Sequence, residues 1–347
     1  MGEDISGDRL SSLPEVLIHH IFSFMNMREV VHTSILSNRW RYLWLSPPVL
    51  NFKLPCNPCA NRNCSEYASR CYKCKDKLDK FITFVYRVLV SRQSNITMLD
   101  LSVYRTLDAK HVHAWLIGAL AREAHEVTLN LLFDKPIDLP QLLFSPKNMR
   151  DLNLYMGELP FARLPKSIHR ATRLTNLEQR NVVFQEEDAN GELSLSFPVL
   201  KNLMIKYCNV SHLTLLENME FSSLPKNSLP KKGNNCCKVM LCTPNLKSLL
   251  SSSGCPPWKT FFLDNLVSIV STSITIWSPT KECAERLFKV LTGISNVQNL
   301  VMSTTRLYAP RYVVQGLKNR FWAACRDPRK WFISMPTDIS GYHVTIP

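Results

Sequence analysis

The sequence predicts an α+β to α/β chain in which three short N-terminal helices precede an irregular solenoid of short repeats. Two patterns support this prediction. Apolar residues recur at helical spacing behind helix-start signals over residues 8–52, and an L-x-x-L-x-L pattern recurs farther along roughly every 25 residues. A length of 347 residues is too great for one small core, so we expect two or three structural units.

The first helix is predicted to begin at Ser12. Ser12 and Glu15 fit a capping box, and Pro14 falls in the first turn, where its missing N–H is harmless. One apolar stripe follows at helical spacing, formed by Leu13, Leu17, Ile21 and Phe24.

A second and a third helix are predicted from the same kind of signal. Asn26 with Glu29 repeats the capping pattern, and Ser37 can begin a helix that Pro47 ends. The third helix would carry Trp40, Leu43 and Trp44 on one side. Three short helices cannot bury so much apolar surface among themselves, which favours contact with another molecule or with the next domain. The alternative is an ordinary helical bundle, and the pattern alone does not decide between them.

The residues of this segment follow a known motif in order and without a gap. They read DRLSSLPEVL at 8–17, IFSF at 21–24 and VVxTSxLSxRWxxLW at 30–44, and the segment closely resembles the plant F-box. The resemblance implies an F-box over residues 8–52 that binds the Skp1 adaptor of an SCF-type ubiquitin ligase, and through it a cullin. It assigns the adaptor-facing or supporting apolar surface to Leu13, Pro14, Val16, Leu17, Ile21, Phe22, Val30, Val31, Leu36 and Trp40.

Residues 53–74 are predicted to be a cysteine-rich insert or linker. Cys56, Cys59, Cys71 and Cys74 form a C-x2-C-x11-C-x2-C pattern that could close a tetrahedral structural zinc site. The second pair has no glycine, and the separation is shorter than in common zinc ribbons. The other interpretation is a polar insert whose cysteines are incidental. No other cofactor is expected.

Residues 75–309 are predicted to form the repeat region. Amphipathic helices are expected over 75–91 and around 112–120. The apolar triplets then begin at Ile96, Ala124, Met149, Leu174, Leu200, Leu246, Ser271 and Val297. This spacing lies in the range of leucine-rich repeats, in which each unit contributes one short strand and buries its apolar face against its neighbours.

Other structures are predicted for the parts of the sequence where the repeat pattern is irregular or absent. A degenerate unit is expected around Leu213–Leu216, an exposed excursion over 222–238, a helix over 282–294, and a non-repeat tail over 310–347. A doubly wound sheet is the alternative fold, but the regular spacing and the scarcity of glycine argue against it. The runs FPVLKNL at 197–203 and TPNLKSL at 243–249 resemble plant F-box/LRR proteins.

The sequence predicts no enzyme. It contains 10 glycines, none of them in a G-x-G, which excludes the glycine-rich phosphate loops, and it has no G-x-S-x-G. The resemblance instead implies a non-catalytic, substrate-recognition subunit that holds an unknown target protein through its repeats. The alternative is a basic nucleic-acid-binding or scaffold repeat protein, since the net charge is +14, although the cations are dispersed.

The N-terminus and the hydropathy pattern indicate where the chain acts. Met1–Asp4 is acidic and no apolar stretch follows, which does not fit a secretory signal peptide. No segment is apolar enough for a membrane span. We therefore expect an intracellular protein, in the nucleus and/or the cytoplasm, with neither secretion nor membrane insertion.

Overall fold

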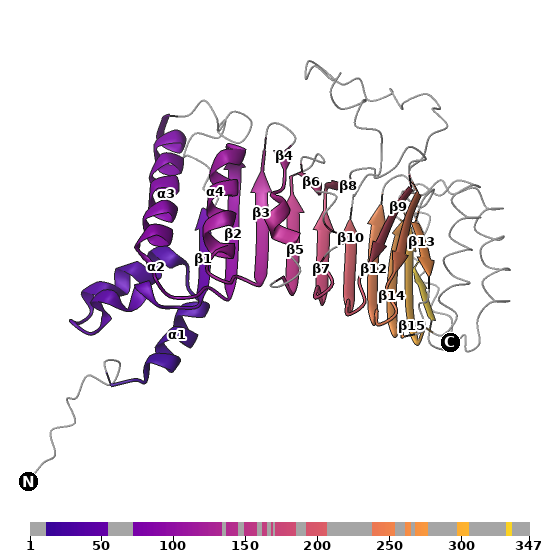
Figure 1. The fold of residues 1–347 in the computed structure, drawn as a ribbon, viewed down its shortest axis with the longest axis horizontal. Helices are drawn as coiled ribbons and strands as arrows, with labels where there is room; N and C mark the ends of the chain where they lie inside the picture. Colours follow the sequence, from indigo (N-terminus) through magenta and orange to yellow (C-terminus); the bar gives the residue numbers. More distant parts are fainter. Residues whose placement is uncertain are drawn as a thin grey trace, which may run out of the picture. The chain divides into compact units, whose positions relative to one another are not determined.

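The computed structural model divides the chain into two units, Met1–Gly157 and Glu158–Pro347. It describes residues 12–54, 72–133, 137–144, 149–157, 162–164, 168, 171–184, 192–206, 238–253, 261–264, 268–276, 297–304 and 331–334 (Figure 1). Each unit is built on a sheet of parallel strands.

The first unit begins with two α-helices, α1 (Glu15–Ser23) and α2 (Met27–His32). The capping box predicted for the second helix is confirmed. The Asn26 side chain accepts from the backbone N–H of Arg28 at 3.1 Å, and the Asn26 N–H donates to Glu29 Oε2 at 3.0 Å. The helix start predicted at Ser12 is corrected, because α1 begins at Glu15 and its N-cap is the extended residue Pro14, which provides no side-chain cap hydrogen bond.

The third predicted helix is also corrected. The 3₁₀ segment η2 (Trp40–Leu45) takes its place, and another 3₁₀ segment, η1 (Thr33–Ile35), follows α2 directly. The proline at position 47 cannot continue a helix, so the stretch that begins at Ser37 is short, and short stretches commonly form i→i+3 turns. The side chains of Ile18, Phe22, Met27, Val30 and Trp40 form the buried interior of this part.

A parallel sheet follows in the same unit. Its strands β1 (Val49–Leu54), β2 (Met98–Thr106), β3 (Glu126–Leu132) and β5 (Asp151–Met156) lie in sequence order. Leu99 is paired with Leu50 on one side and with Val127 on the other, so the predicted apolar triplets are in register. Strand β1 was not predicted, and it crosses the expected boundary between residues 52 and 53.

Helices cover one face of this sheet. The two predicted helices are confirmed as α3 (Tyr72–Ser91) and α4 (Ala109–Leu120), which contact each other beside β1 and β2 (Figure 1). Trp115 of α4 is fully buried and meets Phe81 of α3 edge-on, with ring centroids 6.3 Å apart. The short strand β4 (Ile137–Asp138) and the 3₁₀ segment η5 (Gln141–Phe144) follow in the next return leg.

The second unit continues the repeat with strands on its return legs. Its main strands are β7 (Asn176–Arg180), β10 (Asn202–Lys206), β12 (Ser248–Ser253), β14 (Ser271–Ile276), β15 (Asn299–Thr304) and β16 (Trp331–Ser334), again parallel. A second set of parallel strands contains β9 (Glu192–Ser196), β11 (Lys238–Cys242) and β13 (Phe261–Asp264). The strands β6 (Ala162–Leu164) and β8 (Val182–Phe184) also pair. This sequential, solenoid-like order differs from a doubly wound sheet, in which the strand order reverses.

One predicted repeat unit is out of register by two residues. Thr272, rather than Ile274, pairs with Leu249 of β12, and Ile274 pairs with Ser251. The buried triplet is therefore Ile269, Thr272 and Ile274. An apolar pattern misses this register because a threonine occupies a position where the other units carry an aliphatic residue.

Several predictions fall outside the described residues. They are the degenerate unit at Leu213–Leu216, the excursion over 222–238 apart from its last residue, and the helix over 282–294. The same holds for Cys56, Cys59, Cys71 and the side chain of Cys74. The predicted non-repeat tail contains β16, which extends the sheet beside β15. Among the described residues, no helix combines the length and the apolar character needed to cross a bilayer.

Candidate functional site

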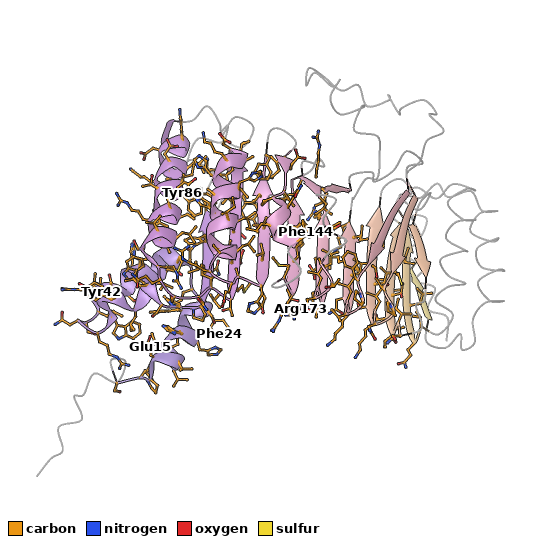
Figure 2. All side chains as sticks on the ribbon, in the orientation of Figure 1. Glu15, Phe24, Tyr42, Tyr86, Phe144 and Arg173 are labelled. Carbon is orange, nitrogen blue, oxygen red and sulfur yellow. The ribbon has the colours of Figure 1, made fainter. Side chains whose placement is uncertain are left out.

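Large apolar side chains are exposed on the N-terminal helical part in two groups. The α1 group consists of Val16, Leu17, Ile21 and Phe24, and the η group of Ile35, Leu36 and Tyr42. Figure 2 shows Phe24 and Tyr42 on this part, from the end of α1 and from η2. Val16 and Ile35 are the most exposed members, at 78% and 86%. Exposed apolar side chains of this size are typical of surfaces at which proteins bind other molecules.

The helical period of α1 explains the α1 group. Ile18 and Phe22 lie four residues apart and face the interior, where Phe22 meets Trp40 edge-on with ring centroids 5.6 Å apart. Leu17 and Ile21 have the same spacing one residue earlier and therefore lie on a neighbouring, exposed stripe. The predicted stripe of Leu13, Leu17, Ile21 and Phe24 thus exists, but it faces outward more than inward.

The residues that the F-box resemblance singled out separate into three classes. Pro14, Val16, Leu17, Ile21 and Leu36 are exposed, Leu13 and Val31 are half-buried, and Phe22, Val30 and Trp40 are buried. The first class is available to a partner, and the last supports the helices from inside. Sequence reasoning missed Phe24, Ile35 and Tyr42 as surface residues, although Phe24 continues the predicted stripe.

A polar cluster holds the end of η2 against α1. Ser46 Oγ lies 2.9 Å from His19 Nε2 and 3.3 Å from Glu15 Oε1, and His19 lies 3.4 Å from the same carboxylate (Figure 2 labels Glu15). Burial lowers the pKa of His19 below its ordinary value, Glu15 opposes this effect, and Arg92 adds to it. The lowered pKa favours the neutral imidazole of His19 in the cluster that holds η2 against α1.

Arg92 joins the helical part to the sheet. Its guanidinium is buried and donates to the carbonyls of Trp44 and Pro47, while Ser94 Oγ donates to the carbonyl of Leu45 at 2.9 Å. Burial, with a contribution from Arg122, lowers the pKa of Arg92 to about 10. Arg92 remains charged at neutral pH and satisfies the last carbonyls of the helical part.

The face of the sheet opposite α3 and α4 is polar. Side chains from neighbouring strands form hydrogen bonds along it, since Asn130 Nδ2 donates to the Tyr104 hydroxyl at 2.9 Å and Asn153 Nδ2 to Thr128 Oγ1 at 3.2 Å. This regular row of amides and hydroxyls offers donors and acceptors to an extended partner. Within the described part of the chain, no three His, Cys, Asp or Glu side chains lie together as metal ligands would.

Comparisons with known proteins agree with this arrangement. Residues 10–52 match the F-box domain family, so an F-box domain forms the N-terminal part. A putative F-box/LRR-repeat protein of Arabidopsis thaliana is 27% identical over 256 residues, covering 71% of this chain and 55% of the relative. A putative F-box/FBD/LRR-repeat protein of the same plant is 25% identical over 325 residues, covering 84% of this chain and 62% of the relative.

A further F-box/LRR-repeat protein from Arabidopsis thaliana is 25% identical over 312 residues, covering 88% of this chain and 94% of the relative. The chain thus spans only 55% and 62% of the length of the first two relatives. No solved structure matches it. The resemblance to plant F-box/LRR-repeat proteins is therefore confirmed.

Proposed function

We propose that this chain is the substrate-recognition subunit of an SCF-type ubiquitin ligase. Its F-box binds a Skp1-like adaptor, and through it a cullin, while its repeats bind a target protein. The observation that carries the proposal is the exposure of the α1 and η groups on a domain that matches the F-box. Proteins of this kind typically serve as adaptors for substrates and do not themselves catalyse ubiquitin transfer.

The chemistry of the α1 and η groups suits a stable protein interface. Large apolar side chains supply the central contacts of such interfaces, and the rim is polar. Here the apolar side chains are supported from below by Phe22, Val30 and Trp40, which are almost fully buried. A rigid support lowers the cost of ordering the surface when the partner binds.

The polar row on the open face of the sheet is the proposed target-binding surface. Its amides and hydroxyls, such as those of Asn130 and Tyr104, are already held in place by bonds between strands. The net charge of +14 favours an acidic target. The subunit would act by proximity, because holding the target near the charged carrier enzyme raises the effective concentration of its lysines.

This role requires no cofactor and is exercised in the nucleus and/or the cytoplasm, where SCF ligases act. A structural zinc at Cys56, Cys59, Cys71 and Cys74 would be an addition to it. Elemental analysis of the purified chain distinguishes bound zinc from incidental cysteines.

The test of the proposal is adaptor binding by two matched variants of the full chain. Val16 and Val90 are both helical valines and are 78% and 77% exposed, but only Val16 belongs to the F-box. We expect Val16→Asn to weaken binding to a purified Skp1-type adaptor at least about tenfold, because the interface would bury an unpaired amide. Asparagine is neutral, so the helix dipole does not bias the comparison.

Val90→Asn should bind the adaptor as the wild-type chain does. Isothermal titration calorimetry gives the dissociation constants, and circular dichroism verifies that both variants are folded. The proposal fails if the wild-type chain does not bind the adaptor, or if the two variants bind it equally well.

A further inference from the structure

A basic cavity lies within the first unit, where the F-box meets the first strands. It has a volume of about 260 Å³ and is lined by side chains or backbone of α2, β1, α3 and β2. Its lining includes the cationic side chains of Arg28, Lys77, Lys80 and Arg105, and no acidic residue is among its lining residues. Lys53 also lines it, but Lys53 alternates with the buried Phe52, which packs on α3, so its ammonium is directed to the other face of β1. This cavity is separate from the α1 and η groups and from the polar row of the sheet.

The positive charge of the basic cavity is only partly neutralised. Lys80 Nζ lies 2.8 Å from Asp76 Oδ2, and Lys53 Nζ lies 3.7 Å from Asp100 Oδ2. In the part of the chain that the structure describes, no carboxylate lies at ion-pair distance from Arg28, Lys77 or Arg105. An excess of cations around a small cavity attracts an anion.

Arg105 supplies an independent sign of a ligand. It is only 7% exposed, and its Nε is buried without a hydrogen-bond partner among the described residues. It follows Leu101 and Val103 on the helix-covered side of β2, and the pairing of β2 with β3 is irregular between Val103 and Thr106. Irregularities of this kind re-aim a side chain. A buried, unpaired guanidinium donor is costly unless a ligand accepts from it.

We propose that the basic cavity binds a small free anion that carries more than one phosphate group. A guanidinium presents parallel N–H donors that match a phosphate, and two or three further cations can neutralise a second group. The volume of about 260 Å³ is slightly below the usual range of small-molecule sites, which excludes a bulky ligand. Phe81 and Phe84 form an apolar wall beside the cations. This wall excludes water and so strengthens the attraction between the cations and a bound anion.

Binding would connect the F-box to the repeats. Arg28 belongs to α2, Lys77 to α3 and Arg105 to β2, so one anion contacts elements on both sides of the junction. A hydrogen bond already joins the two parts at one side of the cavity, since Asn26 Nδ2 donates to the carbonyl of Lys53 at 2.9 Å. The proposal does not depend on adaptor binding and stands or falls separately from it.

The experiment is calorimetric titration of the full chain with pyrophosphate at fixed ionic strength. We expect saturable binding at one site, weakened at least about tenfold by Lys77→Gln, which removes an exposed cation of the cavity. Arg105→Gln should weaken it further. Lys247→Gln, which removes an exposed lysine from the second unit, is the matched control and should bind as the wild-type chain does.

Three results would overturn the proposal. They are no saturable binding by the wild-type chain, equal weakening by Lys77→Gln and Lys247→Gln, and tighter binding of a phosphoserine peptide than of pyrophosphate. The buried Arg105 is also structural, so a folding defect in Arg105→Gln is measured by circular dichroism, and Lys77→Gln then decides. A rise in melting temperature with pyrophosphate, absent in Lys77→Gln, is the second readout.

Discussion

Replacing Ile35 by alanine should separate adaptor binding from folding stability. Ile35 ends η1 in the η group and is 86% exposed, so it contributes little to the interior. Ile117 of α4 is the matched control, because it is also an exposed helical isoleucine, at 51%, and lies outside the F-box. We expect Ile35→Ala to weaken binding of a Skp1-type adaptor and Ile117→Ala to leave it unchanged.

The magnitude follows from the exposed side chain. Full burial of an isoleucine is worth about 1.5–3 kcal/mol. With 86% of Ile35 exposed in the free chain, burial against a partner contributes about 1.3–2.6 kcal/mol. This corresponds to a dissociation constant raised about ten- to seventyfold. Surface substitutions change the free energy of unfolding by only about 0.5 kcal/mol, so stability should stay almost constant.

The assay is a pair of measurements on each full-length variant. Calorimetric titration with the adaptor gives the dissociation constant, and urea unfolding followed by circular dichroism gives the free energy of unfolding. The reasoning is refuted if Ile35→Ala binds within twofold of the wild type, if Ile117→Ala weakens binding equally, or if the binding loss is matched by an equal loss of stability.

Three further predictions concern folding. Phe22→Ala should lower the free energy of unfolding by about 3–5 kcal/mol, because it empties a buried site against Trp40, and a urea-unfolding loss below about 1 kcal/mol would contradict this. Gln179→Met should raise that free energy by about 1–2 kcal/mol, since both amide atoms of Gln179 are buried without hydrogen-bond partners among the described residues; a lower melting temperature would count against it. Burial lowers the pKa of His19 below 6.5, so protons bind the unfolded chain more tightly than the folded chain. The contribution of His19 to the free energy of unfolding is therefore fully present above pH 6.5 and is lost as the pH falls through the folded pKa. His19→Gln should reduce this decline without abolishing it, because burial lowers the pKa of His111 as well. The measurement is urea unfolding at pH 7.5 and pH 5.5, and an equal loss of stability in the wild-type chain and in His19→Gln would disprove the role of His19.

The helices of the F-box show how far periodicity alone can reach. The spacing of Leu17, Ile21 and Phe24 predicted a stripe correctly, yet it could not tell that stripe from the one formed by Ile18 and Phe22. Both stripes are apolar, and only packing against Trp40 decides which of them turns inward. The surplus of apolar residues was therefore a better guide to a binding surface than the assignment of any single residue.

The repeats were predictable where the first two buried positions of a unit are apolar, even where the third is polar, as at Gln179 and Ser251. The register failed at Thr272, because hydropathy does not reveal a threonine that is buried on a strand. Strand β1 was missed because the F-box motif already accounted for its first four residues. The basic cavity was equally hidden, since Arg28 and Arg105 are far apart in sequence and meet only when α2 lies against β1.

The junction between the F-box and the repeats has a consequence for the proposed function. Only Ser46, Pro47 and Pro48 separate η2 from β1, so no flexible linker intervenes. The buried Arg92 binds the carbonyl of Pro47, and β1 pairs along its length with β2. A receptor that acts by proximity benefits from such stiffness, because a fixed spacing keeps the effective concentration of the target high. The packing of the first unit therefore sets the distance between the proposed adaptor-binding surface and the repeats. A substitution that removes the hydrogen bonds of the Arg92 guanidinium should impair ubiquitin transfer to the target more than it impairs adaptor binding.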